Sequence, residues 1–147
     1  MKVTAADNAF STCIKERVNW HCEKCNKEFP QGTTVRGGLD CHHLITRGGW
    51  AVRYDPDNAV ALCVHDHRVW AEGNPFEVSE WAENKFGIVR INSIRRKAER
   101  VEIGKRAHRE QREIAAHYRK ELAYMQMVRA EGNRERNDFA DYFEEVK

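Results

Sequence analysis

The sequence has no long apolar run and no strong surplus of charge of one sign. No stretch reaches the roughly 18 apolar residues of a membrane-spanning helix, and residues 1–10 lack the apolar segment of roughly 7–15 residues typical of a secretory signal. The formal net charge is +2 at pH 7 and the pI is near 8.3, which is too mild to indicate a nucleic-acid partner by itself. We therefore expect a cytoplasmic protein with no membrane partner.

Cysteine is also too sparse for a disulfide-bonded framework. The chain has five cysteines, an odd number, and two of them form a Cys22-x-x-Cys25 pattern. Disulfides persist in oxidising compartments, whereas closely spaced thiols in a reducing compartment are typical of metal sites. The cysteines therefore favour a bound metal ion over disulfide bonds.

What the chain does have is abundant charge, unevenly distributed. Of its 147 residues, 33% are charged and 41% hydrophobic, which favours one domain with a small core and long solvated helices. Residues 90–120 hold eleven Lys/Arg and four Glu, whereas residues 121–147 hold seven Asp/Glu and four Lys/Arg. A face that contacts phosphates requires such a local positive surplus.

Hydrophobic spacing predicts helices and strands in the first half of the chain. Apolar residues at i, i+4 and i+8 predict a short amphipathic helix within residues 1–20. Residues 33–35 and 39–45 predict two strands, and residues 58–62 lead into another helix. The overall class is therefore α+β, with a small core between helical segments.

A further helix is expected over residues 76–86, ending at Gly87. Its spacing turns Phe76 and Trp81 inward, with Val78 as an additional candidate for the inward face.

The last third of the chain is helix-prone and highly charged over residues 93–130, with Gly104 and Gly132 as candidate interruptions. One apolar stripe recurs at helical spacing in Ile114, Tyr118, Leu122 and Met125. This stripe packs either on the protein's own core or on the same helix of a second subunit, which would form a homodimer. We divide the chain into a core with flanking helices (residues 1–92) and a charged helical extension with an acidic tail (residues 93–147), which is part of the same domain or a dimerisation arm.

Three cysteines have the spacing of a treble-clef-like zinc site. Cys22 and Cys25 on a tight turn can present two sulfurs to one ion, and Cys63 at the start of a helix can supply a third. Zn²⁺ prefers thiolate ligands, so we expect a structural zinc that staples the fold. The alternative is that these cysteines are reduced, buried and free of metal.

The sequence does not decide which residue is the fourth zinc ligand. A ligand is expected three residues after the third cysteine, where Asp66 stands. Asp66 and the neighbouring His65 are equal candidates, and His67 and Cys41 are further ones.

Four polar residues in the same region suit phosphodiester hydrolysis. His42 and His43 point to opposite faces of a strand, so one can bind a cation while the other acts as a base. His67 can complete the cation site, and Asn58 can fix the base by bonding either the backbone or the imidazole. For any one histidine, a structural or surface role is the alternative.

Basic residues near these histidines and in the following helix could contact a phosphate backbone. They are Arg47, Arg53, Arg68, Arg95, Arg96 and Lys97. An ordinary solvated surface explains the same residues equally well.

Residues 20–70 resemble the HNH nucleases, whose core is the ββα-metal (His-Me) finger. The matching pieces are Cys22-x-x-Cys25, Asp40-Cys41-His42-His43-Leu44, the segment 57–63 and His67. The resemblance implies that His43 is the general base, that His42 and His67 bind catalytic Mg²⁺ or a similar ion such as Mn²⁺, and that Asn58 orients the base. It also implies structural zinc at Cys22, Cys25 and Cys63. Asp66 departs from the family, whose zinc-binding members usually have a fourth cysteine there.

A narrower likeness is to the NinG (Rap) recombination endonucleases of lambdoid phages. Residues 52–55 before Asn58, residues 73–75, and the charged terminal helix are arranged similarly. That family has a glycine where His42 stands in this chain.

The sequence thus predicts a metal-dependent DNA endonuclease, structure-selective or non-specific, in phage or bacterial DNA recombination or processing. We expect it in the cytoplasm of a bacterial or phage-infected cell, acting on DNA, with branched DNA as a candidate substrate. The competing hypothesis is a zinc-stapled module that binds DNA or protein without catalysis.

Overall fold

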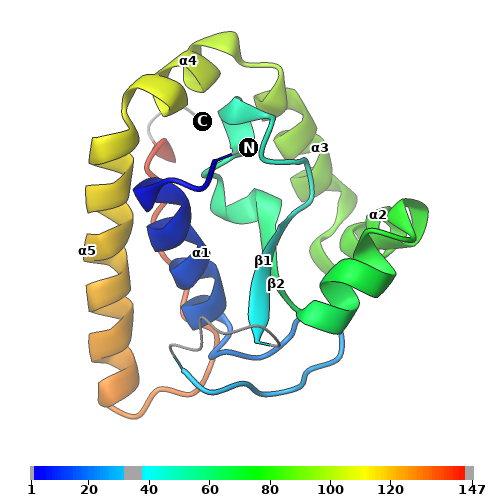
Figure 1. Cartoon of the computed structure of the whole chain (residues 1–147), viewed down its shortest axis with the longest axis vertical. Coiled ribbons are helices and arrows are strands. Elements are labelled where there is room, and N and C mark those ends of the chain that lie inside the picture. Colours follow the sequence, from blue (N-terminus) through cyan, green and yellow to red (C-terminus); the bar gives the residue numbers. More distant parts are fainter. Residues whose placement is uncertain (1, 32–37, 145–147) are drawn as a thin grey trace.

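A computed structural model describes residues 2–31 and 38–144, and it confirms the α+β class (Figure 1). A two-stranded antiparallel sheet lies between helices. The helices and strands are α1 (Ala5–Arg17), β1 (Leu39–His43), β2 (Ala59–Cys63), α2 (Pro75–Phe86), α3 (Ile88–Ala98), α4 (Val101–Arg109) and α5 (Gln111–Ala130). Short helical segments complete the chain: η1 (Trp50–Val52), η2 (Pro56–Asn58) and the π-helix η3 (Asp66–Ala71). Within the described residues, no helix combines the length and the apolar character that crossing a membrane requires.

The first helix, α1, is where the sequence predicted one. The Thr4 hydroxyl accepts the backbone N–H of Asp7, and the Asp7 carboxylate accepts the backbone N–H of Thr4, which makes a reciprocal capping box. After α1 the chain turns through Asn19 and Trp20, both with positive φ, which ends the helix.

The sheet pairs β1 with β2 so that Leu39 lies opposite Cys63 and His43 opposite Ala59. All of β2 is buried, which explains its continuous apolar sequence. The strand expected at 39–45 ends at His43, two residues earlier than the apolar pattern suggested, and the strand expected at 33–35 lies outside the described residues.

Helix α1 lies between α5 and the sheet (Figure 1). The apolar stripe of α5 is directed into this core: Ile114, Tyr118 and Met125 are buried and Leu122 is partly buried. The stripe therefore packs on its own chain and is not free to pair two subunits. The expected core and the expected extension share one hydrophobic cluster.

Two expectations about the later helices are wrong. Phe76 is 90% exposed and does not face inward, whereas Val78 is buried and Trp81 packs against the core as expected. Gly104 does not interrupt a helix but lies within α4, where it faces the backbone of Ala51 in η1. The helices of this region instead break at residues 99–100 and at Glu110, and Gly132 follows the end of α5 with φ +103°.

Candidate functional site

The structure brings together three cysteines and one carboxylate. Cys22 and Cys25 lie on the turn after α1, Cys63 ends β2, and Asp66 begins η3. One ligand atom from each of these residues lies within 4.8 Å of all the others. The Cys22 and Cys63 sulfurs are 3.2 and 3.3 Å from Asp66 Oδ2. These four side chains are close enough to bind one metal ion, and the donor set is compatible with zinc.

Backbone hydrogen bonds fasten this cysteine turn to the sheet. The backbone N–H of Glu23 donates to Ala61 O (2.9 Å), and the Glu23 carboxylate accepts the Ala61 N–H (2.8 Å). Burial raises the pKa of the Cys22 and Cys63 thiols, so a cation is needed to favour the thiolates there. The chemistry of the cluster therefore fits a metal ion.

The structure separates the candidates for the fourth ligand. The side chain of His65 is 76% exposed, and its Nδ1 lies 3.5 Å from Asp66 Oδ1, on the outer side of that carboxylate. Cys41 is not part of the four-residue cluster, and the ring of His67 faces Asp40 instead. Asp66 alone among these candidates joins the three cysteines.

A pair of imidazoles forms a second feature beside the sheet. The ring centroids of His42 and His67 are 5.2 Å apart. Asp40 Oδ2 is 2.9 Å from His67 Nδ1, so the carboxylate accepts a hydrogen bond from Nδ1–H and the lone pair lies on Nε2, 4.0 Å from Glu72 Oε1. Asp40 lies two residues before His42 in β1, on the same face of the strand. No role was predicted for Asp40 from the sequence, although its two-residue spacing from His42 is visible there.

The His42 imidazole is neutral at pH 7. Burial, followed by the nearby His67 and His43, lowers the pKa of His42 to about 4. Neutral imidazole is the form that binds metal ions. Among the described residues, however, the only compact group of three or more potential ligands is the cysteine cluster, so His42 and His67 make a pair rather than a complete cage.

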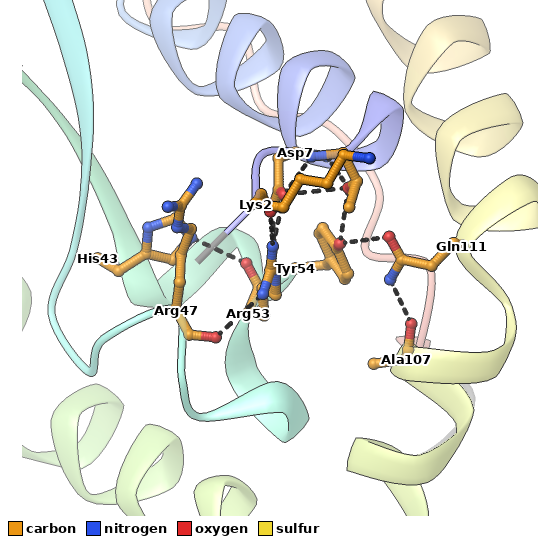
Figure 2. Close-up of polar contacts among 9 residues, drawn as sticks. Lys2, Asp7, His43, Arg47, Arg53, Tyr54, Ala107 and Gln111 are labelled. Carbon is orange, nitrogen blue, oxygen red and sulfur yellow. Dashed lines mark hydrogen bonds and ion pairs between the residues drawn. The ribbon is translucent and has the colours of Figure 1, made fainter.

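His43 is held by a backbone carbonyl. Its Nε2 lies 2.9 Å from Arg53 O (Figure 2). A carbonyl oxygen only accepts, so Nε2 carries the proton and the lone pair of the neutral ring is on Nδ1. Burial lowers the pKa of His43 to about 4, although the bond to Arg53 acts in the opposite direction. The ring is therefore a neutral, oriented base at pH 7.

Arg53 is not a phosphate ligand, which corrects the sequence-based expectation. Its side chain is 0% exposed, and its Nε and NH2 groups donate to the two carboxylate oxygens of Asp7 at 2.9 and 2.5 Å (Figure 2). The guanidinium also lies 4.2 Å from the ring centroid of Trp50. The side chain of Arg53 is thus held by Asp7 of α1, and the backbone carbonyl of the same residue fixes His43.

Asn58 bonds the backbone and not the imidazole, which decides between the two expected roles. Its side chain accepts from Ile45 N (2.8 Å) and donates to Ile45 O (2.9 Å) and Val52 O (3.0 Å). These bonds join Ile45, which follows β1, to Val52, which precedes Arg53. Asn58 therefore fixes both segments that surround His43.

The remaining basic residues differ in availability. Arg47 is half-buried beside His43, and its charge contributes to the lowered pKa of that histidine (Figure 2). Arg68 and Arg96 are exposed, and Arg95 lines a cavity of about 430 Å³ together with His42 and His43.

Lys97 does not fit the expected role in phosphate binding. Its side chain is only 18% exposed, and its Nζ lies 2.8 Å from Asp55 and 3.8 Å from Asp141. Two carboxylates of its own chain therefore already neutralise Lys97.

Comparison with known proteins gives no relative from which to assign a function. No protein family, curated protein or solved structure matches this chain.

Proposed function

We propose that this protein is a metal-dependent DNA endonuclease of the HNH type, with β1, β2 and η3 as its ββα-metal core. The observation that carries the proposal is His43, whose neutral ring is fixed by a carbonyl at Nε2 and which is among the residues that line the same cavity as His42. The cysteine cluster would hold a structural zinc that braces this core.

In this proposal, His43 takes a proton from the attacking water at Nδ1. His42 and His67 would hold a divalent cation, Mg²⁺ or Mn²⁺, with His67 oriented by Asp40. When bound, that cation supplies Lewis-acid stabilisation of negative charge on the phosphate and the leaving oxygen. Arg47 beside His43 and Arg95 at the cavity add positive charge where a phosphate would approach. The resemblance to phage recombination nucleases favours branched DNA as the substrate.

The first test is cleavage by the wild-type protein and by His43→Ala. Loss of a general base removes about 10²–10⁴ in rate, so we expect at least a hundredfold slower cleavage with DNA binding retained. Nicking of plasmid DNA and cutting of linear, nicked and branched substrates are measured with Mg²⁺ or Mn²⁺, and with EDTA.

His108→Ala is the matched control, because His108 is exposed on α4 and does not line the cavity. Cleavage by His43→Ala at the wild-type rate would remove His43 from this role.

One observation favours a second function, a zinc-stapled binding module. The cysteine cluster is the only compact group of three or more potential ligands in the described residues, and a binding module needs nothing more. Inactivity of the wild type with Mg²⁺, Mn²⁺, Ni²⁺ and Zn²⁺ on every substrate, with DNA or protein binding retained, would favour the module.

A further inference from the structure

Arg17, near the end of α1, is a buried cation with an incomplete set of partners. Its side chain is among the largest that are fully buried, and the residue is 2% exposed. Nη1 donates to Pro56 O and Nη2 to Ala59 O, each at 2.8 Å. Among the described residues, its Nε–H has no hydrogen-bond partner. A buried N–H without an acceptor is unfavourable, and more so in a charged group.

The other two buried arginines show what Arg17 lacks. Arg53 is paired with Asp7, and Arg129 lies 3.4 Å from the buried carboxylate of Glu16. In the part of the chain that the structure describes, Arg17 has no carboxylate within ion-pair distance. Because an unpaired buried charge is costly, the surroundings of Arg17 call for an anion.

A cavity of about 500 Å³ opens beside Arg17 and gathers more positive charge. The charged side chains that line it are Arg17, Lys85, Arg90, Arg136, Asp57 and Asp138. The four cations come from α1, α2, α3 and the segment after α5, so the fold brings them together from distant parts of the sequence.

Neighbouring acids cancel only part of this charge. Asp57 lies 3.5 Å from Arg90 and Asp138 lies 3.0 Å from Arg136, and both of these carboxylates are exposed to solvent. The buried carboxylate of Glu23 also lies 3.4 Å from Arg136. Lys85 donates to the backbone carbonyl of Glu23 at 2.7 Å. Burial and then Arg136 lower the pKa of Arg17 to about 10, as expected where like charges meet. With Glu23 counted, four cations face three acids, so a positive surplus of one charge remains at the cavity.

We propose that this cavity binds a phosphate group, with the Arg17 guanidinium at its buried end and Arg90 and Arg136 at its open side. Guanidinium groups match the oxygens of a phosphate in geometry and charge. The group could be free phosphate or the phosphate of a nucleotide strand, since the chemistry is the same. The cavity is separate from the His43 site, because none of its lining residues lines the cavity at His42 and His43. The proposal does not depend on nuclease activity.

The test is a titration of the full chain with inorganic phosphate, followed by NMR of the arginine Nε–H signals. We expect a saturable shift of the Arg17 signal that sodium chloride at the same ionic strength does not produce. Arg90→Gln and Arg136→Gln should each weaken phosphate binding about tenfold, the usual effect of losing one charge-assisted hydrogen bond. Both side chains are partly exposed, so these variants are expected to fold, and their amide spectra verify it.

Arg119→Gln is the matched control, because Arg119 is exposed on α5 and lies outside this cavity. Two further arms, a nucleoside 5′-monophosphate and a dinucleoside monophosphate, distinguish a terminal phosphate from a phosphate within a strand. An Arg17 signal that responds equally to phosphate and chloride, or unchanged phosphate affinity in both cavity variants, would overturn the proposal.

Discussion

Asp7 takes part in two structures at once. It closes the capping box of α1 with Thr4, and it neutralises the buried guanidinium of Arg53. The Arg53 carbonyl oxygen in turn accepts a hydrogen bond from Nε2–H of His43. A residue at the start of the first helix is therefore linked, through one arginine, to the proposed base.

We predict that Asp7→Asn destabilises the protein by about 3–5 kcal/mol at pH 7, since it leaves a buried guanidinium without its anion. Burial alone raises the pKa of Asp7, but hydrogen bonds from Arg53 and Thr4 outweigh it, so the folded-state pKa is lowered. A lowered pKa means that this stabilisation is complete above the ordinary carboxyl pKa of about 4 and is lost as the pH falls below it. Urea unfolding at pH 7 and pH 3 measures the difference in free energy of unfolding between the wild type and Asp7→Asn. This difference should be smaller at pH 3.

Glu83→Gln is the control for this prediction, because the Glu83–Arg95 pair is exposed and should contribute little. An equal cost of Asp7→Asn at both pH values would contradict the linkage.

Residue types alone do not distinguish the arginines near His43. In sequence, Arg47, Arg53 and Arg68 were equal candidates for phosphate binding. Only the contact with Asp7, 46 residues away, shows that Arg53 is internal. Likewise, Asp66 and His65 were equal as zinc ligands until the position of Cys22, 44 residues earlier than Asp66, was known.

At the scale of elements, the packing of α5 on α1 supports the whole site, because α1 carries Asp7. Tyr118 of α5 donates its hydroxyl proton to Tyr54 O (2.6 Å), and Cys13 of α1 contacts Tyr118 O (3.2 Å). The Tyr54 hydroxyl donates to Gln111 of α5 (2.9 Å), so α5 is also joined to the residue after Arg53 (Figure 2).

We predict that Ile114→Ala lowers the free energy of unfolding by about 2–5 kcal/mol, because Ile114 is fully buried in this interface and its truncation leaves a cavity. Met127→Ala, on the exposed face of the same helix, should change it by less than about 0.5 kcal/mol. Thermal or urea unfolding of the two variants gives the comparison. A larger loss in Met127→Ala would mean that α5 buries its other face.

The spacing of apolar residues predicted α1, α2 and the stripe of α5, because helical periodicity is local. It did not predict where residues 93–130 break. Glycine often interrupts a helix, yet Gly104 stays helical where α4 meets η1. The helix ends at Glu110 instead. On α2, Phe76 was also wrongly expected to face inward, since the end of the inward face depends on what α2 packs against.

On the scale of the molecule, the cysteine cluster joins three segments: the turn after α1, the end of β2 and the start of η3. A metal ion there would connect the first helix to the strand and to the segment that carries His67. Such a link should contribute to the stability of the whole fold, because the ion binds the folded state and not the unfolded chain.

We predict that the purified protein contains about one zinc ion per chain and that a strong chelator lowers its melting temperature by about 10 °C or more. Metal analysis and thermal unfolding with and without chelator measure this. Asp66→Ala should bind zinc more weakly, and the chelator should lower its melting temperature by less than that of the wild type. Removal of Mg²⁺ alone is the control and should leave the melting temperature unchanged. A metal-free protein whose melting does not respond to chelator would leave the four side chains as a hydrogen-bonded cluster only.

The sequence by itself determined what depends on near neighbours: the capped α1, the alternation that puts Asp40 and His42 on one face, and the two thiols of the Cys22 turn. The tertiary structure alone decided what depends on distant neighbours. It placed Arg53 inside and Asp66 among the cysteines, it turned the α5 stripe onto α1, and it gathered three further cations around Arg17. The reason is physical: backbone periodicity and turns are set within a few residues, whereas burial and ion pairing depend on which segments meet in space.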